Sequence, residues 1–188
     1  GKRTVFCRRY ANGQNNAELR AVLSFLLLRR TKQQVLSELP EKEEHLIYCD
    51  FSEEESNLYH AIRLAAISRI RETGYTSSVI LTGILRLRQC CCHPSILDQN
   101  SNPDNLSYSA KFNVCTDLIS NFVSSGQKIL VFSQFTKMLK LLYNWAQEQP
   151  FPSFYLDGAT TDRQTTVDCF EHSVSGVFFI SLKAGSLG

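Results

Sequence analysis

The chain has 188 residues, 43% of them hydrophobic, which is enough for one domain with a buried core or one domain plus an appendage. The formal net charge is only +2, so charge alone does not indicate a nucleic-acid-binding protein. The seven cysteines form no Cys-x-x-Cys pair and no secretory signal opens the chain, which indicates reduced thiols rather than a disulfide framework. The longest apolar runs, such as Phe25 to Leu28, are too short to span a membrane.

A basic segment follows the first predicted helix. Ala17 to Leu28 is the expected helix, and Pro40 ends the pattern because proline disfavours a helical conformation in the residue before it. The segment between them carries three cations: Arg29, Arg30 and Lys32. Taken alone, such a segment is more often a solvated basic face, and the alternative is a linker that contacts phosphate groups.

A helical hairpin is predicted after a short strand at His45 to Phe51. Ser52 and Glu55 have the spacing of a capping box, which marks the start of a helix. This helix is expected to end near Gly74, and a second helix is expected to begin near Ser77. The predicted core stripes are Leu58, Ile62, Ala65 and Ala66 in the first helix, and Ile80, Ile84, Leu87 and Cys91 in the second.

The run Cys90 to His93 raises a zinc hypothesis. Adjacent residues on a helix point about 100° apart, so three consecutive cysteines cannot all reach one tetrahedral ion. No second pair of ligands follows at zinc-finger spacing. We therefore favour small buried residues that end a helix before Pro94, and we expect no metal site.

Helices and strands alternate from Ser109 onward, after a polar loop at residues 98–108 that we take as a domain boundary. Short apolar runs predict three strands: Lys128 to Ser133, Phe154 to Leu156 and Val177 to Ser181. This alternation predicts an α/β fold with a parallel sheet and flanking helices. The first run has the composition of a strand that is buried on both faces.

Polar residues and glycines follow each predicted strand. They are Ser133 and Gln134 after the first strand, Asp157 and Gly158 after the second, and Ser181 to Gly188 with Lys183 after the third. If the strands are parallel, these groups share one edge of the sheet, where ligands of such folds bind. Hydroxyls, amides and a lysine can bind phosphate groups, whereas few groups here would recognise the edge of a base. This predicts nucleic-acid binding that does not depend on sequence. The alternative is that the glycines merely shape tight turns.

Several short motifs occur in a characteristic order. They are Leu28-Arg29-Arg30-Thr31-Lys32 with Leu39-Pro40, Leu85 to Pro94, Ser109-Ala110-Lys111, Lys128 to Phe135, Leu156-Asp157-Gly158 with Thr160 and Arg163, and Ser181 to Gly185 with Gly188. Over nearly the whole chain, this set resembles the Swi/Snf-type helicase-like ATPases of helicase superfamily two. The residues of these motifs look most similar to those of bacterial members, which implies that the protein lies in a bacterial cytoplasm rather than in a nucleus.

The resemblance implies part of an ATP-driven motor that moves along double-stranded DNA. Residues 1–31 would be the tail of the first lobe and the linker, residues 32–108 a helical insertion, and residues 109–188 the first part of a second RecA-like lobe. The family's P-loop, acidic box and arginine finger match no segment here. We therefore expect no catalytic residue in this chain and no ATP hydrolysis by it alone.

The resemblance also implies roles for single residues. Ser133, Gln134 and Lys183 would contact DNA. The segment that couples DNA to the nucleotide would comprise Ser181, Ala184, Gly185 and Gly188, with Ser186 where the family often has a second glycine. Supporting roles would fall to Asp157, Gly158, Arg163, Arg29, Arg30 and Lys32.

The implied cofactors are ATP and magnesium in the full-length protein, with neither bound by this chain alone. The implied partners are double-stranded DNA, the first RecA-like lobe of the same chain, and a DNA-bound protein such as RNA polymerase, but no membrane. Two other classes of function remain open from the residues: an α/β module that binds a protein partner, and a zinc-dependent module at Cys90 to His93.

Overall fold

The computed structural model describes residues 3–11, 13, 15–27, 42–97 and 109–185. The chain divides into two compact units, Gly1–Leu46 and Ile47–Gly188. The basic segment with Arg29, Arg30 and Lys32, the loop at 98–108, and Gly188 lie outside the described residues. Within the described residues, no helix combines the length and hydropathy that a transmembrane span needs.

The first unit contains two short helices, α1 (Arg3–Tyr10) and α2 (Asn16–Ser24), and no residue of either helix is buried. The guanidinium group of Arg9 pairs with the carboxylate of Glu18 between them. The helix that we predicted to run to Leu28 ends at Ser24. The Ser24 hydroxyl donates to the Ala21 carbonyl over 2.7 Å, and such local bonds compete with continuation of a helix.

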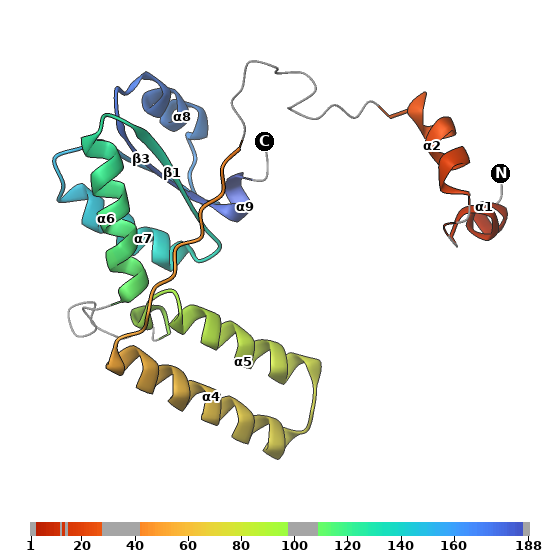
Figure 1. Ribbon diagram of the computed structural model, residues 1–188, viewed down its shortest axis with the longest axis horizontal. Coiled ribbons are helices and arrows are strands. Elements are labelled where there is room, and N and C mark those ends of the chain that lie inside the picture. Colours follow the sequence, from red (N-terminus) through yellow and green to blue (C-terminus); the bar gives the residue numbers. More distant parts are fainter. Residues whose placement is uncertain (1–2, 12, 14, 28–41, 98–108, 186–188) are drawn as a thin grey trace. The chain divides into compact units, whose positions relative to one another are not determined.

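The predicted helical hairpin is confirmed. Helices α4 (Glu53–Thr73) and α5 (Ser77–Cys90) lie side by side and antiparallel (Figure 1). The capping box forms, because the Ser52 hydroxyl accepts from the Glu55 amide and the Glu55 carboxylate accepts from the Ser52 amide. Gly74 follows α4 with a φ of 86°, a conformation that glycine adopts without strain.

The inner stripe of α5 differs from the prediction. Ile84 is 48% exposed, whereas Gly83 lies against α4, where a Cβ on it would come within 3.1 Å of the Ala66 Cβ. Cys90 is buried, and Cys91 is only half-buried. Ile80 and Leu87 are half-buried as predicted, so the stripe shifts by one residue only at the other two positions. The shift to Gly83 lets the two helices approach where a larger side chain would separate them.

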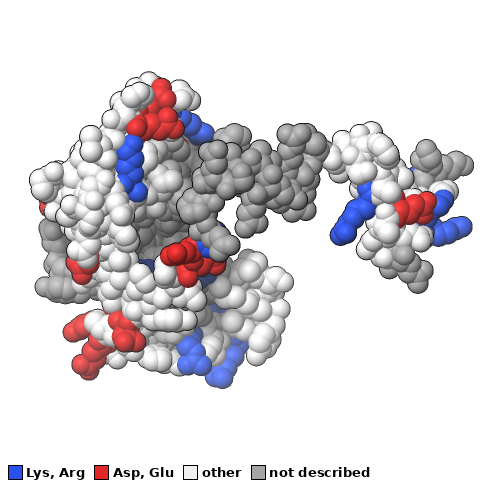
Figure 2. Space-filling model, turned by 45° about the horizontal axis from the view of Figure 1, so that its top comes forward, with Lys and Arg blue, Asp and Glu red and all other residues white. Residues whose placement is uncertain are grey.

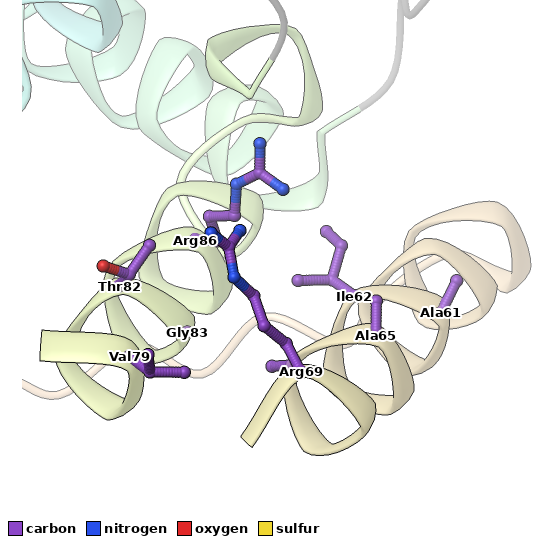
Figure 3. A pocket seen from close by; sticks show the side chains of 9 residues that line it. Ala61, Ile62, Ala65, Arg69, Val79, Thr82, Gly83 and Arg86 are labelled. Carbon is purple, nitrogen blue, oxygen red and sulfur yellow. The ribbon is translucent and has the colours of Figure 1, made fainter. Parts of the chain in front are cut away.

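A groove of about 280 Å³ lies between α4 and α5 (Figure 3). Small residues, including Ala61, Ala65 and Gly83, line it together with Arg69 from α4 and Arg86 from α5. The two helices therefore meet closely at Gly83 and leave this groove open beside that contact.

His45 to Phe51 form no strand, so that prediction was wrong. The sheet of the described residues is built from other segments and does not include them. Leu46 is 82% exposed and Tyr48 is 87% exposed, so these side chains do not pack into the hydrophobic core.

The second unit contains a parallel sheet with the order β1-β3-β2. The elements after the hairpin are η1 (Pro94–Ile96), α6 (Ala110–Ser124), β1 (Lys128–Ser133), α7 (Thr136–Gln147), β2 (Ser153–Leu156), α8 (Arg163–His172), β3 (Gly176–Ser181) and α9 (Leu182–Gly185). The three predicted strands and their parallel arrangement are confirmed. This is the α/β class expected from the alternating pattern.

Hydrophobic clusters cover both faces of the sheet. One cluster joins Val177 and Phe179 of β3 to helices α6 and α7, and the other joins Phe178 and Ile180 of β3 to α8 and α9. Every residue of β3 is therefore buried. By contrast, β1 is an outer strand of the sheet that the described residues form, and one of its faces is uncovered. Leu130 and Phe132 on that face are each 50% exposed, so the prediction that β1 is buried on both faces was wrong.

Candidate nucleic-acid interface

The carboxyl ends of all three strands meet at one edge of the sheet, as predicted. Ser133 of β1 pairs with Ser181 of β3, and Leu156 of β2 pairs with Ile180 of β3. Asp157 therefore follows β2 level with Ser181. The turns after the strands lie side by side in the spatial order β1, β3, β2.

The turn after β1 presents a hydroxyl and an amide. The Ser133 Oγ accepts a hydrogen bond of 3.1 Å from the Phe135 amide, which fixes the turn and leaves the hydroxyl hydrogen for another acceptor. The Gln134 side chain is exposed, and its Oε1 accepts a hydrogen bond of 2.8 Å from Nη2 of Arg88. Arg88 lies in the last turn of α5, so the hairpin contacts this turn directly.

Asp157 organises the turn after β2. Its buried carboxylate accepts from the Ala159 amide over 2.8 Å and from the Tyr155 hydroxyl over 3.0 Å, while its own amide donates to the Thr160 hydroxyl oxygen over 3.0 Å. Burial alone would raise the pKa of Asp157, but these hydrogen bonds and the charge of Lys140 hold the pKa below its ordinary value. Asp157 therefore shapes the turn.

The other two supporting residues of this turn have different surroundings. Nε of half-buried Arg163 donates over 3.4 Å to the Thr160 carbonyl, so Arg163 ties the start of α8 to the turn. Gly158 is exposed, and a Cβ on it would meet no atom within 4 Å. Arg163 thus has a structural partner, and nothing within the described residues requires glycine at 158.

A short helix follows β3, where we had expected a glycine-bearing loop. The buried Ser181 Oγ accepts from the Ala184 amide over 3.2 Å, as a serine does at a helix N-terminus, and this bond starts α9. Ala184 is buried and Lys183 is exposed. A Cβ on Gly185 would lie 3.2 Å from Ile180 and 3.3 Å from Phe132, so this glycine permits close packing on the sheet.

A buried glutamate joins the hairpin to the sheet domain, and sequence reasoning missed this role. Both carboxylate oxygens of Glu55, which is 3% exposed, accept from the Ala110 amide over 3.2 Å, in addition to the capping-box bond at Ser52. Glu55 therefore serves the N-termini of both α4 and α6. The Ser109 hydroxyl reinforces the joint by donating over 3.1 Å to the Cys92 carbonyl.

His93 belongs to the same joint. Its Nδ1 accepts from the Ser95 amide over 3.2 Å, and its ring packs edge-on against Phe112. Burial raises the pKa of the neighbouring Cys90 to about 11, so this thiol stays protonated near neutral pH. In the described part of the chain, no three His, Cys, Asp or Glu side chains gather as metal ligands would.

We expect His93 to make folding stability depend on pH. Burial lowers the pKa of His93 from its ordinary 6.5, and Glu55 opposes this only in part. Below about pH 6.5 the unfolded chain binds a proton that the folded chain does not, so the free energy of unfolding falls as pH decreases toward the folded pKa. Urea unfolding at pH 7.5 and 5.5 should show a smaller pH dependence for His93→Asn than for the unaltered chain. An equal pH dependence of stability in His93→Asn and in the unaltered chain would contradict this role of His93.

The described residues carry charged side chains of both signs on the face seen in Figure 2. Figure 2 shows basic and acidic side chains of the described residues scattered over the face in view, without one continuous basic patch. The small net charge of the chain agrees with this distribution. The case for an interface therefore rests on the donors at the strand ends and on comparison with known proteins.

Two family models match the chain. Residues 4–96 match the SNF2-related domain, and residues 110–188 match the helicase conserved C-terminal domain. A human SWI/SNF-related matrix-associated actin-dependent regulator of chromatin, subfamily A member 1, is 31% identical over 182 residues, which are 90% of this chain and 18% of that protein. The DNA excision repair protein CSB of rice is 30% identical over 178 residues, which are 90% of this chain and 15% of that protein.

A solved structure gives the corresponding likeness in three dimensions. The SWI2/SNF2 ATPase core of Sulfolobus solfataricus in complex with double-stranded DNA aligns with a TM-score of 0.64 and 26% identity, covering 90% of this chain and 38% of that one. The chain thus spans less than a fifth of the two curated relatives. Both relatives are eukaryotic, so the expected closeness to bacterial members finds no support in them.

Proposed function

Because the chain belongs to the Swi/Snf-type family of helicase-like ATPases, we propose that its full-length parent is an ATP-driven motor on double-stranded DNA, and that this chain supplies part of the motor's second lobe. Residues 1–31 form the end of the first lobe and the linker, residues 32–108 the helical insertion, and residues 109–188 the start of the second RecA-like lobe. The gap between the two family matches, from 97 to 109, supports the boundary near 108.

The observation that carries this proposal is the shared strand-end edge in a fold whose solved relative holds double-stranded DNA. Ser133, Gln134 and Lys183 bring a hydroxyl, an amide and an ammonium group to that edge. These groups donate hydrogen bonds to phosphate oxygens and recognise no base edge. The motor therefore tracks the DNA backbone without regard to sequence.

The turn after β3 is suited to couple DNA to the nucleotide. Ser181 at the end of β3 and Ala184 in α9 are buried, and Gly185 packs on the sheet. Exposed Lys183 lies in α9 between Ser181 and Ala184. A force on Lys183 therefore passes directly to the central strand β3. Asp157, Gly158 and Arg163 form the neighbouring turn and support this edge. We also assign a supporting DNA contact to three cations of the linker, which would contact phosphate groups of the DNA: Arg29, Arg30 and Lys32.

ATP and magnesium belong to the parent protein. A bound nucleotide supplies the phosphoryl group whose hydrolysis drives movement, and its usual grip is a Gly-x-x-x-x-Gly-Lys-Ser/Thr loop. The sequence of this chain contains no such loop. Its own residues therefore do not fit a complete nucleotide site, and we assign to them the DNA contact and its coupling only.

We propose that the motor acts on a protein assembly that is bound to DNA. The human relative is named for chromatin regulation and the rice relative for DNA excision repair. Their eukaryotic origin favours a nuclear location for the parent. RNA polymerase remains one candidate target, and the first RecA-like lobe of the same chain is the intramolecular partner.

The test is phosphate release by the full-length parent with and without double-stranded DNA. We expect DNA to stimulate release, and Gln134→Ala and Lys183→Ala each to raise the DNA concentration for half-maximal stimulation by about 10-fold, because each variant removes a phosphate donor. Basal release should change less than stimulated release. A parent that DNA does not stimulate would contradict the motor, and equal losses in basal and stimulated release would contradict the DNA role of these residues.

A matched control is Gln164→Ala, which removes the same kind of side chain from α8. The Gln164 amide donates to Asp168 over 2.8 Å on the surface of that helix. We expect its DNA requirement to stay within about twofold of the unaltered parent. The logarithm of DNA affinity falls linearly with the logarithm of the salt concentration, and the slope of this line should be less steep by about one in Lys183→Ala. The reason is that one fewer cation is released from the DNA.

A further inference from the structure

The contact between Arg88 and Gln134 fixes which end of the Gln134 amide faces outward. A guanidinium group only donates hydrogen bonds, so the group that it meets at 2.8 Å is the amide oxygen, Oε1. The amide nitrogen, with two donor hydrogens, therefore occupies the other branch of the side chain. Residues 46 positions apart in the sequence make this bond, across the boundary between the hairpin and the sheet.

We propose that Arg88 is a positioning residue that holds the Gln134 amide with its NH₂ group presented to a DNA phosphate. This inference rests on the proposed DNA contact of Gln134. A phosphate oxygen accepts hydrogen bonds, so an amide turned the other way would present oxygen to oxygen and repel the DNA. An exposed glutamine samples both orientations and many rotamers, and the bond to Arg88 selects one of them before DNA arrives.

A second contact keeps the hairpin end beside the same turn. The Nζ atom of Lys137, at the start of α7, lies 3.5 Å from the Ile96 carbonyl oxygen in η1. Between these two contacts lies a hollow of about 200 Å³, lined by Gln89 and Ile96 on one side and by Gln134 to Lys137 on the other. The end of the hairpin and the turn after β1 thus form one joint, and the position of α5 determines that of the Gln134 amide.

A double-mutant cycle in the full-length parent separates positioning from direct contact. If Arg88 acts through Gln134, Arg88→Ala should raise the half-saturating DNA concentration by about 3- to 5-fold, and the same change in a Gln134→Ala background should add nothing. The dependence of DNA affinity on salt should keep its slope in Arg88→Ala, because no phosphate contact is lost. Arg88→Lys retains a donor and should recover part of the affinity.

Arg86→Ala is the matched control, because it removes the same charge from the same helix at a residue that lines the α4–α5 groove (Figure 3). It should leave the DNA requirement within about twofold. Additive effects of Arg88→Ala and Gln134→Ala, or a salt slope reduced by about one, would overturn the positioning role while leaving the motor intact. A parent without DNA stimulation, or a Gln134→Ala parent with unaltered DNA dependence, would overturn the underlying DNA contact and this inference with it.

Discussion

Replacing Gly176 by alanine is expected to lower the free energy of unfolding by about 3 kcal/mol, from backbone strain of roughly 1–2 kcal/mol and a steric clash of similar size. Gly176 begins β3 with a φ of +145°, and a Cβ on it would lie 2.6 Å from the Pro152 carbonyl oxygen. That oxygen accepts the Val177 amide over 3.1 Å, so it cannot withdraw without breaking a bond at the start of the central strand.

Urea unfolding of the chain measures this effect, and Gly158→Ala is the control. Gly158 has no positive φ, and a Cβ there would meet nothing within 4 Å, so its substitution should change stability by less than about 0.5 kcal/mol. Equal stability of the two variants would mean that the close approach at Gly176 is absent. The result bears on function, because β3 carries Ser181 and leads into the helix that holds Lys183.

Features that depend on neighbouring residues could be predicted from the sequence. The capping box needs only Ser52 and Glu55, three positions apart, and it forms as predicted. The strand bounds also follow from short apolar runs, as β1 shows at Lys128 to Ser133. The shared strand-end edge follows in turn, because parallel strands bring their carboxyl ends together whatever their order.

Features that depend on distant residues could not be predicted in this way. The runs that form β1 and β3 are equally apolar, so their composition does not tell which strand is central and which lies at the edge. The shift of the α5 stripe from Ile84 to Gly83 depends on the contact of Gly83 with Ala66 on α4, and glycine carries no hydrophobic signal. The bond from Arg88 to Gln134 spans 46 positions, so no local pattern contains it.

Replacing Glu55 by alanine is expected to cost about 2–3 kcal/mol of stability, from the lost helix cap and from a buried amide left without an acceptor. The carboxylate of Glu55 accepts from the amide of Ser52, which caps α4, and from the amide of Ala110, which lies 55 positions after Glu55 and begins α6. The positive ends of α4 and α6 both face this carboxylate and stabilise its negative charge, although the residue is only 3% exposed.

Hydrogen exchange at the Ala110 amide provides the direct measurement, alongside urea unfolding. Glu55→Ala should expose this amide to faster exchange, and Glu55→Gln should keep part of the protection because its amide oxygen still accepts. The control Glu53→Ala removes the same charge from the same helical turn at an exposed position and should cost only about 0.5 kcal/mol. Unchanged exchange in Glu55→Ala would contradict the joint.

The joint at Glu55 also bears on DNA binding, because the hairpin that it anchors presents Arg88 to Gln134. If Glu55 fixes the base of α4 against α6, loosening that base lets α5 drift from the turn after β1. A Glu55→Ala parent that remains folded should then need about 3-fold more DNA for half-maximal stimulation, close to the effect of Arg88→Ala. In a Gln134→Ala background this further loss should vanish, since no oriented amide remains to be displaced.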